Sequence, residues 1–269
     1  MPAQVVDVVR IAVVAGVGLL LVRSARAAWS RRRLAVEVWG SIRPRHVVGS
    51  LGLVVVVMAV LVLLLWAVPV TGYGLGSLVG LDGNAVFAPI EGTLEAPVEG
   101  AITAAETGRA APAIPWTDVA VVTGFLALLV ALFPHLAHAE ESAFRTGWED
   151  LDGWGQAWSA LRFGLVHLIM LIPVAAALAI AVAGFTYGRI YLRAYRRAAV
   201  PRVVHVPGRL PLAEDADGYT RLVMGPPTPV LAVDRVGARR SAVLAATVWH
   251  TTFNTTIAVV VWAAYVLSL

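Results

Sequence analysis

The chain has 269 residues, of which 59% are hydrophobic and 14% charged, so it has too little polar surface for a water-soluble domain of this length. All 21 basic residues are arginine, cysteine is absent, and the net charge is +4. Without cysteine, disulfides and thiolate metal sites are excluded. The sequence also shows no basic stripe interleaved with aromatic residues, which argues against nucleic acid as a partner.

Long apolar segments predict that the chain lies in a lipid bilayer. Residues 47–70 contain no charged side chain and would span roughly 36 Å as a helix, enough to cross the hydrocarbon core. Five such segments occur in the chain: about 5–22, 47–70, 117–139, 158–192 and 241–267. We interpret the first as a retained helix and not a signal peptide, because an arginine-rich flank follows it and a cleavage site does not.

The placement of arginines predicts how these segments are oriented. Residues 23–46 hold seven arginines and one acid, and residues 189–240 hold ten arginines and four acids, so both are expected in the cytoplasm. Residues 71–116 hold one arginine and five acids and are expected outside. This outer loop contains the pseudo-repeat APIEG (88–92) and APVEG (96–100), which we interpret as an extended loop or hairpin.

This orientation requires segment 158–192 to cross the membrane an even number of times. Pro173 lacks a backbone donor and tends to break a helix. We therefore predict two short helices, about 158–172 and 174–192, giving about six membrane helices with both termini outside. A single tilted helix would also fit the hydropathy.

The predicted fold class is therefore an all-α, polytopic membrane helix bundle. Residues 1–116 should supply two helices and the outer loop, and residues 117–269 should form the core. Residues 198–240 contain six prolines and no sustained period, so we predict a cytoplasmic insertion with short strands around 220–233.

Three polar clusters interrupt the apolar segments, and ionisable groups within a membrane indicate function by default. The first cluster is EESAFR at 140–145. Glu141 and Arg145 share a helix face and can pair, whereas Glu140 points about 100° away and is free to meet other helices. A solvated helix end would explain this cluster equally well.

The other two clusters are FGLVH at 163–167 and HTTFN at 250–254. In the former, Gly164 would let a neighbouring helix approach closely. In the latter, His250 and Asn254 share a face, roughly 14 Å into the membrane if the helix starts near Ser241. Taken singly, each is also explained by hydrogen bonding within a helix bundle.

Together the clusters predict water-dependent bond cleavage. Glu140 and His167 can remove a proton from water, while His250 and Asn254 can donate hydrogen bonds to an oxyanion. The same four side chains could instead bind a divalent metal such as zinc.

The ordered motifs EExxxR, FxxxH and HxxxN resemble those of the CPBP family of intramembrane proteases, which process CAAX proteins and bacteriocins. The resemblance covers roughly 117–267 and includes the glycine-containing stretch GFTYGRIYLRAY at 184–195. It implies an endopeptidase of the cell membrane that cuts a membrane-associated peptide or protein near the cytoplasmic face. The family is described both as metalloproteases and as metal-free, glutamate-dependent proteases.

Carried over by motif position, the resemblance implies that Glu140 and His167 activate the attacking water. It implies that His250 and Asn254 stabilise the oxyanion. In a metal-dependent member, the same two residues would bind the metal together with Glu140 and His167. Three further positions are assigned supporting roles: Glu141, Arg145 and Phe163.

The chain departs from the family pattern in three ways, the first being that only two helices precede the motif core. Thr146 separates the first motif from the next glycine, and the insertion 198–240 replaces a short turn. A non-catalytic membrane scaffold or immunity protein of the same fold is therefore the main alternative. A proton-relaying transporter is a third hypothesis, which the lack of an inverted repeat disfavours.

Overall fold

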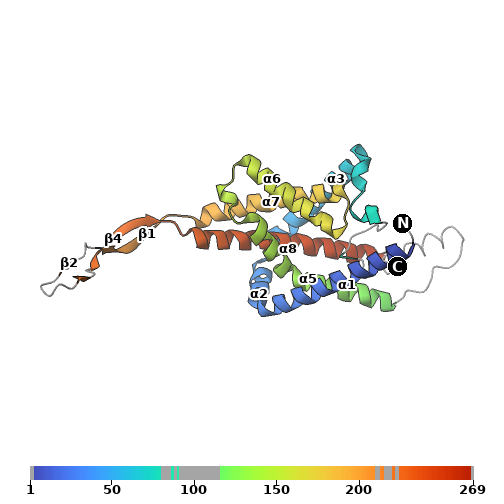
Figure 1. The fold of residues 1–269 in the computed structure, drawn as a ribbon, viewed down its shortest axis with the longest axis horizontal. Helices are drawn as coiled ribbons and strands as arrows, with labels where there is room; N and C mark the ends of the chain where they lie inside the picture. Colours follow the sequence, from blue (N-terminus) through green and yellow to red (C-terminus); the bar gives the residue numbers. More distant parts are fainter. Residues whose placement is uncertain are drawn as a thin grey trace.

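The computed structural model describes residues 3–79, 86–87, 90, 116–209, 213–214, 220–221 and 224–267. Its helices form a bundle, which confirms the predicted all-α membrane fold (Figure 1). The α-helices are α1 (Ala3–Ser30), α2 (Arg32–Ser41), α3 (Pro44–Ala67), α5 (Trp116–Arg145), α6 (Gly153–Val166), α7 (Val174–Ala198) and α8 (Arg235–Leu267). Most of the expected outer loop, including all of the pseudo-repeat except Ile90, lies outside the described residues.

Five helices within the described ranges are long and apolar enough to cross a membrane. They cover Ile11–Ser30, Pro44–Ala67, Trp116–Asp150, Val174–Ala198 and Arg235–Leu267. Helix α6 has 14 residues and is about 21 Å long, shorter than the hydrocarbon core. The chain is thus a multi-pass membrane protein. Its described part has five helices long enough to cross a membrane, and the shorter α6 stands where a sixth membrane helix was predicted.

The predicted break near Pro173 is confirmed, and the single tilted helix is wrong. Helix α6 runs into the 3-10 helix η5 (His167–Met170), Leu171 adopts a left-handed conformation with φ 63°, and α7 starts directly after the proline. Helix α6 starts five residues earlier than expected, because the Asp152 carboxylate accepts the Gly155 N–H at 2.7 Å and caps it. Helix α7 extends to Ala198, beyond the expected end at residue 192.

Contacts on either side of α6 and η5 show which parts of the bundle this segment connects. At one end, the Val174 N–H donates to the Tyr73 carbonyl at 3.0 Å, which places the Pro173 turn beside the segment that follows α3. At the other end, Glu149 lies just before α6 and pairs with Arg239 near the start of α8. Helices α6 and α7 are therefore a hairpin. It returns to the end of the bundle that holds the last turn of α7 and the first turns of α8, which we call the arginine-rich end.

Helix α8 lies in the middle of the bundle and contacts α3, α5 and α7 (Figure 1). Helices α6 and α7 pack closely, because Gly164 has no Cβ that would meet the Ala177 carbonyl and the Ala181 side chain. The predicted close approach at Gly164 is confirmed. Helix α8 begins at Arg235, six residues before the expected Ser241. Three of these six residues are arginine, so the apolar part of the helix still begins at Ser241.

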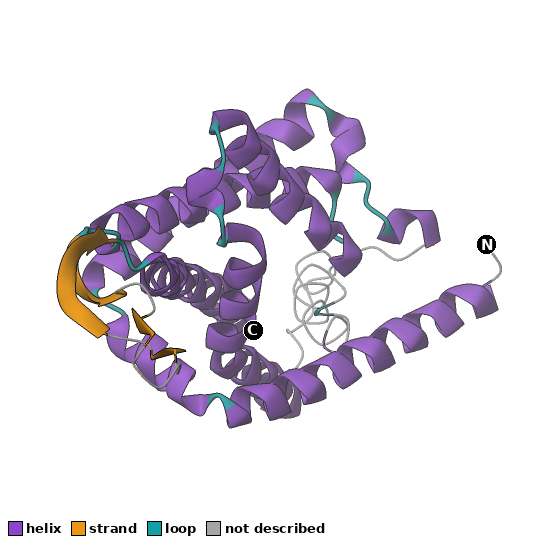
Figure 2. Cartoon of the chain, turned by 60° about the vertical axis from the view of Figure 1, so that its left-hand side comes forward, coloured by secondary structure: helices purple, strands orange, loops and turns teal. Residues whose placement is uncertain are grey.

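The insertion between α7 and α8 contains an antiparallel pair, β1 (Arg202–Arg209) and β4 (Met224–Ala232), and two shorter strands, β2 (Ala213–Glu214) and β3 (Thr220–Arg221). The strands lie together at one end of the helices (Figure 2). Strand β4 confirms the prediction around 220–233, whereas β1 and the short helix α2 were not predicted. Both lie outside the long apolar segments from which the helices were predicted.

The close approach of α6 and α7 yields a first prediction. Gly164→Val should lower the free energy of unfolding by about 1–3 kcal/mol, because the added methyls meet the α7 backbone. Thermal unfolding in detergent would measure the loss. Gly124→Val is the matched control, since a Cβ at Gly124 meets nothing within 4 Å. Equal melting temperatures for the two variants would contradict this packing.

Candidate functional site

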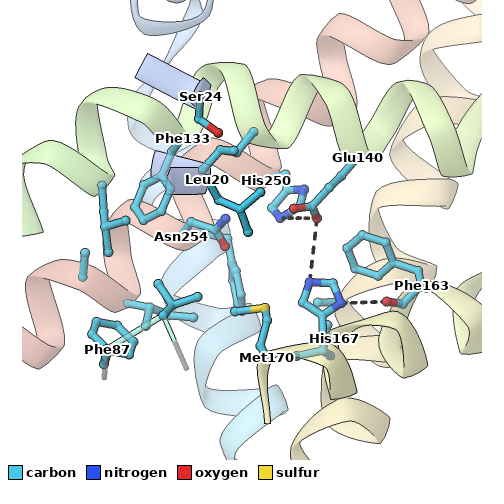
Figure 3. Close-up of a pocket in the computed structure, with 18 of the residues that line it drawn as sticks. Leu20, Ser24, Phe87, Phe133, Glu140, Phe163, His167, Met170, His250 and Asn254 are labelled. Carbon is cyan, nitrogen blue, oxygen red and sulfur yellow. Dashed lines mark hydrogen bonds and ion pairs between the residues drawn. The ribbon is translucent and has the colours of Figure 1, made fainter. Parts of the chain in front are cut away.

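A cavity of about 330 Å³ lies inside the bundle and brings the four predicted reactive residues together. Glu140 comes from α5, His167 from the end of α6, and His250 and Asn254 from α8, and all four line the cavity (Figure 3). The remaining wall is largely apolar and includes side chains from α1, α5 and η5: Leu20, Phe133, Leu136 and Met170. The polar groups are thus concentrated in an otherwise hydrophobic chamber.

Glu140 faces both histidines. Its Oε2 lies 3.7 Å from His167 Nε2 and 3.8 Å from His250 Nε2, and its side chain is 36% exposed. Among the described residues, this buried oxygen has no hydrogen-bond partner. The sequence-based expectation that Glu140 is free to meet other helices is confirmed, and its Oε2 is available to a small molecule in the cavity.

Hydrogen bonds on the far side of each ring fix both imidazoles. His167 Nδ1 lies 2.7 Å from the Phe163 carbonyl oxygen, and His250 Nδ1 lies 2.9 Å from Glu141 Oε1. A carbonyl or carboxylate oxygen only accepts, so Nδ1 carries the proton in both rings. In a neutral ring, Nε2 is then an acceptor facing the Glu140 carboxylate. Three acceptors in one place require a proton, a water molecule or a cation between them.

The Glu141–Arg145 pair predicted from helix spacing is confirmed, with Arg145 Nε donating to Glu141 Oε2 at 3.1 Å. Both side chains are fully buried. The guanidinium carbon of Arg145 lies 5.1 Å from the Trp148 ring centroid and 4.7 Å from that of Phe163. Such cation–π contacts and the carboxylate compensate a desolvated charge.

Helix α7 makes room for this arrangement through two glycines. A Cβ at Gly184 would meet the Phe163 ring and Arg145, and one at Gly188 would overlap the Trp148 ring. The stretch 184–195, recognised in the sequence only by resemblance, therefore packs directly behind the site.

Tyr187, between these glycines, lines the cavity and was not singled out from the sequence. Its ring stacks on His250 with centroids 4.7 Å apart and an interplanar angle of 18°. Its hydroxyl is buried without a hydrogen-bond partner in the described part of the chain. A tyrosine flanked by two glycines in a membrane helix was the only sequence feature that marked it.

Asn254 is partly exposed in the cavity one turn beyond His250. Its amide makes no hydrogen bond to any described residue, so the amide is free to bind a molecule there. Phe163, assigned a supporting role, lies edge-on to His167 and His250, with centroids 5.0 and 5.8 Å away. All seven motif residues therefore meet in one region.

The side chains do not fit a bound divalent metal in this arrangement. The described residues contain no group of three His, Cys, Asp or Glu side chains placed to hold a metal ion. The groups available for chemistry at this site are therefore the protein side chains and water.

No family model matches the chain, and no curated protein or solved structure is significantly similar to it.

The buried pair yields a second prediction. Arg145→Met should cost about 3–5 kcal/mol of stability, because it leaves the Glu141 carboxylate buried without its cation. Adding Glu141→Gln, which can still accept from His250, should recover at least about 1 kcal/mol of that loss. A double-mutant cycle followed by thermal unfolding would measure the coupling, with exposed Arg162→Met as control. Strictly additive losses would show that the pair does not contribute as a unit.

Proposed function

We propose that the protein is an intramembrane endopeptidase that hydrolyses a peptide bond of a membrane-associated peptide or protein. The observation that supports this most strongly is the meeting of a carboxylate, two imidazoles and an amide in one cavity of a membrane-spanning bundle. The motif resemblance to CPBP proteases points in the same direction.

In the proposed reaction, a water molecule binds beside Glu140 and His167. The Glu140 carboxylate takes one proton from the water, and the resulting hydroxide attacks the carbonyl carbon of the scissile bond. His167 Nε2 accepts a hydrogen bond and orients this water, while the Phe163 carbonyl fixes the ring through Nδ1. The proton held by Glu140 then passes to the departing amine as the C–N bond breaks.

His250 and Asn254 are proposed to stabilise the oxyanion of the tetrahedral intermediate. The Asn254 amide donates a hydrogen bond directly. His250 donates through Nε2 when both its ring nitrogens are protonated, and the flanking Glu141 and Glu140 carboxylates supply the countercharge. Tyr187, stacked on this ring, limits its rotation.

The apolar walls of the cavity suit a substrate drawn from the lipid phase. Helix α1 contributes Leu20 and Leu21, and α5 contributes Leu129 and Phe133. These side chains would receive the hydrophobic part of a membrane-associated peptide. The arginine distribution supports a site in the cell membrane, towards its cytoplasmic side.

A purely structural polar cluster, as in a scaffold or immunity protein, fits the geometry less well. Structural clusters pair their polar atoms internally. Both Glu141 oxygens are paired in this way, with Arg145 and His250. Glu140 Oε2 and the Asn254 amide line the cavity and have no hydrogen-bond partner among the described residues, and the proposed reaction assigns them to water and substrate.

The third prediction tests the base. Glu140→Gln should lower cleavage of membrane-tethered peptides by at least about 100-fold, because the amide cannot accept the proton from water. The melting temperature should stay near that of the wild type, since Gln has the same shape. Reconstituted protein and a peptide library analysed by mass spectrometry would measure turnover. Glu37→Gln, an exposed glutamate on α2, is the control and should cleave normally. If the Glu140→Gln variant cleaved peptides at the wild-type rate, Glu140 could not be the base.

The fourth prediction concerns the oxyanion. Asn254→Ala should lower kcat about 100-fold or more while KM changes little, because the lost hydrogen bond forms mainly in the transition state. Steady-state kinetics on one identified peptide would separate the two constants. A rise in KM with kcat unchanged would instead assign Asn254 to substrate binding.

A further inference from the structure

A second cavity, of about 430 Å³, lies where α3, α7 and α8 meet at the arginine-rich end of the bundle. Helix α7 lines it with one stripe that includes Arg193 and Arg197, and α8 lines it with a facing stripe that starts at Ser241. Arg45, near the start of α3, closes the third side. Three helices thus enclose one groove.

The groove carries three arginines and no acidic side chain. Within the described residues, Arg193 and Arg197 form no ion pair or hydrogen bond, and Arg45 contacts only His46, with 3.4 Å between Nε and Nε2. Arg235 and Arg239, by contrast, pair with acids. Like charges gathered around a groove repel one another unless an anion lies between them. Within the described residues, the three groove arginines therefore have no acidic counterion.

The groove also has an apolar surface next to these charged side chains. Trp249 lies against Gly49 of α3, where a Cβ would overlap its ring, and meets the His46 ring edge-on at 5.1 Å. Below the arginines, α8 contributes Leu244 and Val248. Tryptophan and arginine near helix ends are typical of the membrane interface, where a headgroup and its acyl chain require adjacent polar and apolar surfaces.

We propose that this groove binds the phosphate of an anionic phospholipid headgroup. Planar guanidinium groups donate paired hydrogen bonds to phosphate oxygens, and basic pockets between membrane helices accept such headgroups. The acyl chain would continue over the apolar side chains of α7 and α8. Bound in this way, the lipid joins α3, α7 and α8. The inference does not depend on the proposed protease activity.

Binding of short-chain lipids to the purified protein in nonionic detergent tests the proposal. Dioctanoyl phosphatidylglycerol should bind saturably in calorimetry and raise the melting temperature. Arg193→Gln with Arg197→Gln should weaken this binding about 100-fold, roughly tenfold for each charge-assisted contact. The matched control is Arg189→Gln with Arg196→Gln, which removes the same charge from positions of α7 that are also exposed but do not line the groove. The control should bind within about threefold of wild type, because it leaves both groove contacts in place.

Two further ligands test whether the groove recognises a lipid headgroup or a free phosphate compound. Dioctanoyl phosphatidylcholine, whose phosphate is neutralised by choline, should bind more weakly than phosphatidylglycerol. Inorganic phosphate that bound as tightly as the lipid would assign the groove to a soluble phosphate compound and overturn the lipid headgroup. If the groove and control variants lost equal affinity for phosphatidylglycerol, the binding would be general charge attraction and the site would be overturned. The absence of saturable binding by the wild type would overturn it as well.

Discussion

The buried Glu141 carboxylate is the group on which the rest of the site depends. One of its oxygens accepts from Arg145 and the other from His250, and the carboxylate has no exposure to solvent. It thereby ties α5 to α8 in the interior of the bundle. A buried charge is tolerated only when it is paired in this way. Because successive helical residues point about 100° apart, the same backbone that buries Glu141 directs Glu140 into the cavity.

Arg145 requires an equally specific environment. Its guanidinium group lies between Trp148 and Phe163, and those rings fit only because Gly184 and Gly188 leave space on α7. Phe163 also holds His167 through its backbone carbonyl. A chain of contacts therefore runs from the glycines of α7 through the arginine to both histidines. The reactive side chains are positioned by packing across four helices, α5, α6, α7 and α8.

Spacing within one helix was readable from the sequence, whereas most contacts between helices were not. The four-residue interval predicted the Glu141–Arg145 pair, and Pro173 predicted the break between α6 and α7. Nothing local shows that Glu141 also accepts from His250, more than 100 residues away, or that Tyr187 stacks on that ring. The start of α6 was misplaced because Asp152 caps a segment with weak hydropathy. The predicted convergence of Glu140, His167, His250 and Asn254 came from ordered motifs, and the structure confirms it.

The account rests on a water-accessible cavity at Asn254 inside the bundle. Because the chain has no cysteine, Asn254→Cys would introduce a single thiol, which a charged, membrane-impermeant methanethiosulfonate can report in reconstituted protein. The account predicts rapid modification of this thiol and none of Val259→Cys, which is 55% exposed on the outer surface of α8 and would face lipid. If both thiols remained unmodified until the protein was unfolded, the cavity would be dry and hydrolysis could not occur there.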